Sequence, residues 1–418
     1  MSHTPTASFT AAVALCAGLT IGSLAPSPAL AEQISREVGV PLQEANEAIK
    51  KQRWDAALVK IKQAQAVKDK KPLEEYQINE LAGYVYNNQR NYAEAIKAFE
   101  ANLNSGRMPA NQVTGRIKLL SQLYQQAGNN AKALEYGNRW LKAVPNDPDA
   151  SLHVAQVQYA RKDCKSASRN IETAIDAAVK SGQAPKESWL DLKLTCQHDL
   201  NDTDGMTEAR EQLVRYYPNK ENWGSLLASI ANDPELSDPA KLDSYRLMLE
   251  LGVLKKADVY SEMAQIALDN GMPGEAVKIM EQGFETRVLE DDKNKSRHVR
   301  LLEKAKARAQ MAQSEVAALS RKAAANPKGD DDVKLGGAHM SAGQYEKAVE
   351  SLQRGIKKGL KNADEAQVML GRAFLKLNRK EDARKAFGAV PDDSNLAQVA
   401  GLWRVYAVQQ PARTAQRD

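Results

Sequence analysis

Small and large apolar residues follow one another along the chain at a nearly constant distance. An alanine is followed four positions later by a bulky apolar residue, as in Ala95 with Phe99. The same spacing recurs in Ala276 with Met280 and in Ala348 with Leu352. The equivalent alanines Ala95, Ala133 and Ala167 lie 38 and 34 residues apart. A period in this range indicates an array of helix pairs.

The physical reason for the spacing is close helix packing. Small residues let two helices approach each other, and the bulky residue four positions later fills the groove beside them. The pattern therefore predicts an all-α fold, a solenoid of antiparallel helix pairs. Trp403 and Tyr406 predict a C-terminal capping helix that covers the last pair.

Composition agrees with helices and argues against nucleic-acid binding. Aromatic residues make up only 6% of the chain, which suits helices better than sheets. The 58 basic and 53 acidic residues nearly cancel, and the two signs alternate along the chain as on solvated helix faces. Nucleic-acid binding would require a basic stripe, and the sequence indicates none.

Residues 1–31 have the character of a secretory signal peptide. They contain no charged side chain, and Ala29-Leu30-Ala31 gives a small-x-small cleavage pattern before Glu32. The pattern lacks the usual basic residue near the start. We expect cleavage near Ala31 and a periplasmic mature chain without a membrane-spanning segment. The alternative is attachment to the membrane through an uncleaved or lipidated N-terminus, although Leu15 before Cys16 is larger than lipoprotein signals use.

Two cysteines remain after the expected cleavage, Cys164 and Cys196. The repeat register places Cys164 at the start of the second helix of one pair and Cys196 near the end of the next helix. These ends lie side by side in an antiparallel array, so we predict a disulfide that stabilises the fold by about 3–4 kcal/mol. The alternative is that both are independent small core residues.

Several positions resemble the tetratricopeptide repeat family. The matching residues are Gly83, Tyr86, Tyr92, Ala95 and Phe99, then Tyr124, Gly128, Ala133 and Pro145, and late in the chain Gly343, Tyr345, Ala348, Gly371, Phe374, Ala383 and Phe387. The resemblance covers most of the expected mature chain and implies a right-handed superhelical solenoid of about nine repeats with a C-terminal capping helix. It implies a scaffold that binds other proteins, and it does not identify the partner or the oligomeric state.

The array divides into two expected segments. Residues 32–290 form an N-terminal superhelix, and residues 291–410 form a C-terminal segment with the capping helix. Within the second segment, the alanine-rich stretch 296–325 is interpreted as a helix pair of degraded register. Residues 411–418 are expected to form a disordered tail.

Residues 216–284 resemble one particular group of tetratricopeptide repeat proteins. Tyr216-Tyr217-Pro218, Trp223 and Gly252 look like periplasmic tetratricopeptide proteins associated with TonB–ExbB–ExbD energy-transduction systems. The likeness implies an accessory scaffold of a TonB-dependent transport system with TonB-, ExbB- or ExbD-type partners. The alternative is a subunit of an envelope complex for polysaccharide assembly and export or for outer-membrane assembly.

The family resemblance also implies a peptide-binding groove lined by the first helices of successive pairs. Amide side chains there can bond an extended backbone with little regard to its side chains. The alternative is that these residues are only exposed helix formers. The expected groove residues are Gln77, Tyr84, Asn87, Asn88, Gln122, Gln125, Gln126, Gln156 and Tyr159.

Catalytic signatures are missing from the sequence. The five histidines are scattered, and His198 beside Cys196 has no second ligand pair at metal spacing. No phosphate-binding loop, zinc-protease motif or nucleophile elbow occurs. Asp330-Asp331-Asp332 is interpreted as the charge complement of a helix N-terminus. We therefore expect no enzyme activity, no metal site and no cofactor.

Overall fold

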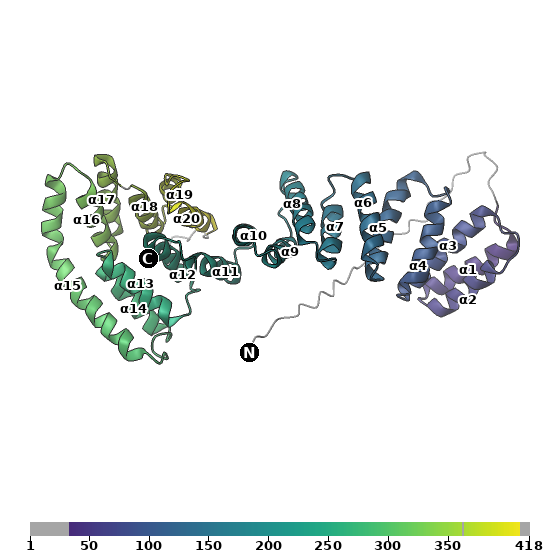
Figure 1. The fold of residues 1–418 in the computed structure, drawn as a ribbon, viewed down its shortest axis with the longest axis horizontal. Coiled ribbons are helices and arrows are strands. Elements are labelled where there is room, and N and C mark those ends of the chain that lie inside the picture. The colour runs from purple at the N-terminus through teal and green to yellow at the C-terminus, as the bar shows by residue number, and fades with distance from the viewer. Residues whose placement is uncertain (1–32, 362, 410–418) are drawn as a thin grey trace, which may run out of the picture. The chain divides into compact units, whose positions relative to one another are not determined.

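The computed structural model describes residues 33–361 and 363–409, and the predicted signal peptide and disordered tail lie outside them. These residues form twenty helices, and no strand occurs among them (Figure 1). The helices follow one another as adjacent pairs, which confirms the predicted all-α solenoid. The chain divides into two compact units, residues 1–128 and residues 129–418.

Unit 1 contains the first five helices, and each packs against its neighbour along the chain. Its core is an apolar seam that includes the fully buried Ile61 and the almost fully buried Ile78. The helices are α1 (Arg36–Lys50), α2 (Trp54–Gln65), α3 (Pro72–Asn88), α4 (Tyr92–Asn104) and α5 (Ala110–Gln126).

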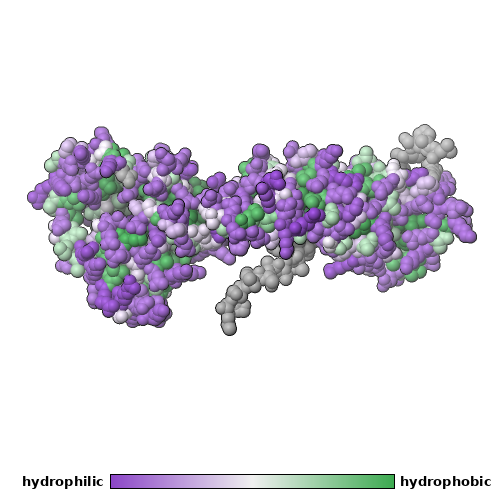
Figure 2. Space-filling view, viewed as in Figure 1, coloured by the Kyte–Doolittle hydropathy of each residue, from purple (hydrophilic) through white to green (hydrophobic). Residues whose placement is uncertain are grey.

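Unit 2 contains the other fifteen helices. They are α6 (Asn130–Ala143), α7 (Pro148–Ala160), α8 (Cys164–Lys180), α9 (Glu187–Asp199), α10 (Thr203–Tyr216), α11 (Lys220–Ala231), α12 (Asp238–Leu251), α13 (Ala257–Asp269), α14 (Pro273–Glu285), α15 (Lys295–Ala325), α16 (Asp330–Ser341), α17 (Tyr345–Lys358), α18 (Asp364–Lys376), α19 (Lys380–Gly388) and α20 (Ala397–Gln409). Hydrophilic residues cover most of the visible surface of this unit, and hydrophobic residues show as separate patches (Figure 2).

The packing expected from the small and large residues is present within the pairs. A Cβ atom added to Gly83 on α3 would lie 2.5 Å from the ring of Phe99 on α4, sixteen positions later. On α18 and α19, Gly371 and Phe387 show the same separation and the same 2.5 Å approach. Any side chain at these glycines would collide with the ring, so glycine sets the distance between the two helices.

A residue with positive φ lies in the turn of several pairs. Gly271 and Gly343 hold this position with φ of 71° and 74°, and Arg90 holds it with φ of 57°. Glycine adopts such a backbone without steric cost, which explains why it recurs in the template. After Arg90, the side chain of Asn91 caps α4 by accepting the backbone N–H of Glu94 at 3.4 Å.

Residues 296–325 do not form the expected helix pair. They lie in a single helix of 31 residues, α15. The sequence from 295 to 325 holds no glycine or proline and is rich in alanine, lysine and arginine, all strong helix formers. Nothing in it ends a helix, so the interpretation as a pair was wrong.

The last helices of unit 2 return to its middle helices. On α20, Trp403 stacks on Phe387 with ring centroids 6.0 Å apart, so the helix covers the last pair as predicted. The same helix also packs against α12. Gln409 at its end accepts a hydrogen bond from Trp223 Nε1 at 3.2 Å and donates one to the carbonyl of Val214 at 2.9 Å.

Helices from both sides of the boundary expected near residue 290 therefore belong to one compact unit. None of the described helices is long and apolar enough to span a bilayer.

Candidate functional site

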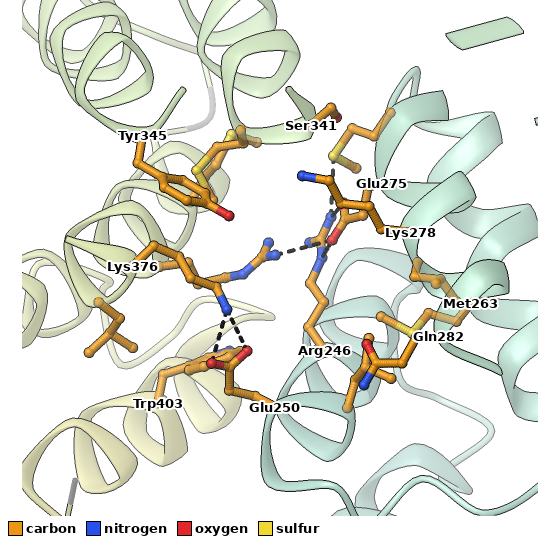
Figure 3. Close-up of a pocket in the computed structure, with 17 residues that line it drawn as sticks. Arg246, Glu250, Met263, Glu275, Lys278, Gln282, Ser341, Tyr345, Lys376 and Trp403 are labelled. Carbon is orange, nitrogen blue, oxygen red and sulfur yellow. Dashed lines mark hydrogen bonds and ion pairs between the residues drawn. The ribbon is translucent and has the colours of Figure 1, made fainter. Parts of the chain in front are cut away.

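A pocket of about 310 Å³ lies within unit 2 (Figure 3). It is lined by side chains from α12, α13, α14, α16, α17, α18 and α20, which include helices from the middle of the unit and from its end. Its volume is at the small end of the range for ligand pockets. The return of the last helices to α12 thus creates a hollow that a straight row of pairs would lack.

One part of the pocket lining is apolar and rich in methionine. Thioether side chains are flexible and polarizable, so such a surface can adapt to apolar groups of different shapes. Trp403 adds a large flat ring beside them, and its buried indole N–H has no hydrogen-bond partner among the described residues. The apolar residues of the lining are Leu249, Met263, Met272, Ile279, Met340, Met369, Leu375 and Trp403.

A cluster of four charged side chains from three helices lies beside the apolar part, and three of them, Arg246, Glu275 and Arg372, line the pocket. Arg246 on α12 donates to Glu275 on α14 through Nε at 2.7 Å and to Asp243 at 3.1 Å. Arg372 on α18 donates to the same Glu275 at 3.1 Å and lies 3.4 Å from Asp243. Two positive and two negative groups are thus paired, which buried charges require.

The pKa of Glu275 reflects this arrangement. Burial alone would raise it, but the guanidinium groups of Arg246 and Arg372 outweigh burial and hold the pKa at about 2. The carboxylate is therefore ionised at neutral pH. It connects α12, α14 and α18 and fixes the shape of this side of the pocket.

Two polar side chains at the pocket form no hydrogen bond or ion pair with the rest of the described chain. Lys278 and Tyr345 point toward the centre of the pocket (Figure 3). Neither side chain has a hydrogen bond or ion pair within the part of the chain that the structure describes. Lys376, in contrast, lies 2.7 Å from Glu250 across the pocket margin. Lys278 and Tyr345 are therefore two groups that remain available to an incoming ligand.

The pocket residues of α18 lie at fixed offsets from the repeat glycine. Arg372, Leu375 and Lys376 follow Gly371 by one, four and five positions, and all three line the pocket. These offsets describe the face of a first helix that turns away from its partner helix.

The same offsets generate three of the predicted groove residues on α3. Tyr84, Asn87 and Asn88 follow Gly83 by one, four and five positions. Counted from Gly371, the same offsets identify three residues of the pocket from the sequence alone.

The predicted groove residues belong to both units, and none is fully buried. In unit 1, Tyr84 packs edge-on to Trp54 with ring centroids 6.1 Å apart, and Asn88 donates to the carbonyl of Tyr84 at 2.8 Å. Among the nine residues, those in unit 1 are Gln77, Tyr84, Asn87, Asn88, Gln122, Gln125 and Gln126, and those in unit 2 are Gln156 and Tyr159. None lines the pocket, and a peptide groove along them stays a prediction.

Cys164 begins α8 and Cys196 lies near the end of α9, as the register predicted. Both are free and buried, and the Cys164 thiol donates a hydrogen bond to Asp199 Oδ2 at 3.7 Å. Burial raises the pKa of Cys196 to about 12, so little thiolate forms at neutral pH. The disulfide stays a prediction: non-reducing mass spectrometry of the protein purified from its native cells should find the two residues bridged, and two free thiols would refute it.

The segment that suggested a TonB association has a structural role. Trp223 is 1% exposed in the core, and Tyr217 donates its hydroxyl proton to the carbonyl of Pro185 at 2.9 Å. Gly252 adopts the left-handed conformation that ends α12. These three residues serve packing and helix termination, whereas other residues of the same segment, Lys278 among them, line the pocket.

The acidic run at the start of α16 forms ion pairs between helices. Asp332 is fully buried and lies 2.6 Å from Arg354 Nε and 2.8 Å from Lys358 Nζ on α17. Asp331 lies 3.1 Å from Lys322 at the end of α15. No group of three histidine, cysteine or acidic side chains in the described ranges has the arrangement of a metal site.

Comparisons with known proteins agree with the helix pairs. The tetratricopeptide repeat model matches residues 42–105 and 333–395. A tetratricopeptide repeat protein from Parabacteroides merdae ATCC 43184 has 12% identity over 81% of this chain and 100% of that chain, with a TM-score of 0.35. The C-terminal part of a repeat protein from Cytophaga hutchinsonii has 9% identity over 80% and 99%, with a TM-score of 0.36.

A search of the curated proteins finds no match. The two matched segments contain α2 to α4 and α17 to α19 and most of α1 and α16. In both of them a first-helix glycine contacts a second-helix phenylalanine. These two segments thus match the tetratricopeptide repeat family and share its helix-pair packing.

Proposed function

We propose that this chain is a protein-interaction scaffold that holds a segment of a partner protein in the pocket of unit 2. The observation that carries the proposal is the pair Lys278 and Tyr345. Both line a methionine-rich hollow, and neither has an intramolecular partner among the described residues. A lysine ammonium and a tyrosine hydroxyl beside an apolar surface suit a ligand with both apolar and polar groups.

The chemistry of the pocket restricts which partner segments it can bind. Its apolar lining accepts one large side chain, such as leucine, methionine or an aromatic residue. The ammonium of Lys278 favours a carboxylate beside that side chain. The four clustered charges, in contrast, already satisfy one another and are not free to bind. They hold α12, α14 and α18 in place before the ligand arrives, which lowers the entropy cost of binding.

A peptide-display selection against the purified chain tests the proposal. Selected peptides should share a bulky apolar residue next to aspartate or glutamate. Lys278→Ala should weaken a selected peptide by about tenfold, since it removes a charge-assisted hydrogen bond worth about 1.5–3 kcal/mol. Tyr345→Phe removes only the hydroxyl group and should weaken binding less.

The matched control is Lys334→Ala, since Lys334 is exposed on α16 and does not line the pocket. This variant should bind the selected peptide as the unchanged chain does. Selected peptides without a shared apolar residue, or equal losses in Lys278→Ala and Lys334→Ala, would contradict the proposal.

We further propose that the scaffold is exported to the periplasm. The support is the predicted signal peptide 1–31 with its cleavage pattern at Ala31. An accessory role in a TonB-dependent transport system is the partner assignment suggested by the resemblance over residues 216–284.

Osmotic-shock fractionation and N-terminal sequencing test the export. Crosslinking in intact cells through a photoreactive residue at Lys278 tests the partner. Recovery of TonB-, ExbB- or ExbD-type proteins is the expected result. Recovery of only polysaccharide-synthase components would reject the transport role and leave the binding pocket unaffected.

A further inference from the structure

The long helix α15 carries a line of basic side chains that serves no contact within the chain. Arg297, Arg300, Lys304 and Arg308 are all exposed. They follow one another at intervals of three, four and four residues, which places them within an arc of about 80° on one face of the helix. These four residues are called the α15 stripe below.

The stripe departs from the charge balance of the whole chain. Across residues 295–325 there are eight basic and two acidic residues. Other cations of α15 form ion pairs, such as Lys306 with Glu281 at 2.9 Å and Lys322 with Asp331 at 3.1 Å. No side chain of the stripe has a hydrogen bond or ion pair within the described ranges. The even mixture of charges expected from the sequence therefore does not hold on this helix.

The first third of α15 and its last residues are packed against other helices. Near the first end, His298 is buried and hydrogen-bonded to Ser261 at 2.8 Å and to Asp292 at 2.9 Å. Near the second end, Lys358 donates to the carbonyl of Ala323 at 2.6 Å. Between Ala305 and Ala323 no residue of the helix is fully buried. The middle of the helix, residues 306–322, thus has no buried residue, and the stripe stays exposed on the first third of the helix as well.

We infer that the α15 stripe is a docking surface for an acidic helix of a partner protein. Charge complementarity requires a negatively charged partner surface, because four unpaired cations in one line attract a matching line of carboxylates. Met311 lies within the same arc and is 65% exposed, and Glu315 follows it there. An exposed apolar residue and a carboxylate at the end of the line suit a protein surface better than a polyphosphate chain or a lipid surface.

The spacing selects a helix as the partner. With a rise of about 1.5 Å per residue, neighbouring cations of the stripe lie about 4.5–6 Å apart along the helix axis. Glutamates at positions i, i+3, i+7 and i+11 of another helix have the same spacing. The two helices can therefore pair all four charges side by side, with an apolar residue opposite Met311.

The test uses two synthetic helical peptides and fluorescence anisotropy with the full chain. One peptide carries four glutamates at the matching spacing and a leucine one turn beyond them, and the other has the same composition in scrambled order. The matched peptide should bind at least about tenfold tighter, and added salt should weaken it. The double variant Arg300→Glu with Arg308→Glu should weaken it about tenfold.

The control double variant is Arg321→Glu with Lys328→Glu, two exposed cations outside the stripe. It should bind the matched peptide as the unchanged chain does. A peptide with lysines in place of two glutamates should restore binding to the Arg300 and Arg308 variant. No preference for the matched peptide, an equal loss in the control, or tighter binding of single-stranded oligonucleotide or anionic vesicles would overturn the inference.

Discussion

The two segments that match the repeat family pack their helix pairs in the same way. They differ in the residues that follow the packing glycine on the first helix. In residues 42–105, Gly83 contacts Phe99, and in residues 333–395, Gly371 contacts Phe387 at the same 2.5 Å. The alanines four positions before the two phenylalanines, Ala95 and Ala383, are fully buried. The helix pairs are thus built in the same way.

The residues that follow each glycine differ. After Gly83, Tyr84 and Asn88 are exposed side chains on α3. After Gly371, Arg372 reaches Glu275 on α14 and Lys376 reaches Glu250 on α12, so the same helix face becomes part of a pocket. The repeat template therefore determines how the two helices of a pair pack together. The helices that lie against that pair determine whether its exposed face becomes a binding site.

The largest expected loss of stability tests the glycine–phenylalanine packing that the two repeats share. Phe99→Ala and Phe387→Ala should each destabilise their own helix pair by about 3–5 kcal/mol, because each leaves a cavity over a glycine. Hydrogen exchange should locate the loss in α3 and α4 for Phe99 and in α18 to α20 for Phe387. Only Phe387→Ala should also weaken peptide binding, since Phe387 supports the pocket residue Trp403. Equal loss of binding in both variants would refute the distinction.

The next effect concerns the charge cluster, which only the second segment contacts. Glu275→Gln should destabilise unit 2 by about 3–5 kcal/mol, since it leaves the paired charges of Arg246 and Arg372 uncompensated. Urea denaturation measures the change. A loss below about 1 kcal/mol, as for a surface pair, would show that the cluster does not hold the helices together.

The same carboxylate gives a pH dependence. Because its pKa in the folded chain is depressed to about 2, its contribution is complete above the ordinary value of 4.5. It is lost as the pH falls toward 2, when the unfolded chain binds the proton more readily. In Glu275→Gln the stability of unit 2 should change less between pH 4.5 and pH 2 than in the unchanged chain. Parallel pH profiles would contradict this.

A smaller effect tests the two glycines directly. Gly83→Ala and Gly371→Ala add a methyl group that would lie 2.5 Å from a phenylalanine ring, so each should cost about 1–3 kcal/mol. Thermal unfolding measures both, and the two costs should be similar because the geometry is the same. Adding Phe99→Leu or Phe387→Leu should recover part of the loss. No recovery would show that steric overlap is not the cause.

The smallest effect concerns the exposed pair at the pocket margin. Glu250→Gln removes the partner of Lys376, and an exposed ion pair contributes about 0–1 kcal/mol. Urea denaturation should therefore distinguish Glu250→Gln clearly from Glu275→Gln, although both carboxylates accept from α18. Equal losses would show that burial does not separate the two pairs.

Much of the fold could be predicted from the sequence because helix-pair packing is local. The spacing of Ala95 and Phe99, the cap over the last pair and the approach of Cys164 to Cys196 all follow from periodicity within a few dozen residues. The long helix α15 was misread because the repeat pattern was extended over a segment that has no turn residue.

The pocket could be predicted only in part. The offsets from Gly371 identify the inward residues of α18. Their partners could not be identified, because Glu275 and Glu250 lie 97 and 126 residues from Arg372 and Lys376 along the chain. A one-dimensional repeat pattern does not say that the last helices return to α12. Likewise, only the structure shows that the cations of the α15 stripe lack intramolecular partners.

The most direct test of the central claim compares equivalent positions in the two repeats. Asn87 with Asn88 and Leu375 with Lys376 lie four and five positions after their glycines. A peptide selected on the unchanged chain is titrated by calorimetry against the double alanine variant of each pair. The predicted result is a loss of about tenfold or more for Leu375 and Lys376 and none for Asn87 and Asn88. A loss confined to Asn87 and Asn88 would place the binding site in unit 1 and contradict the account.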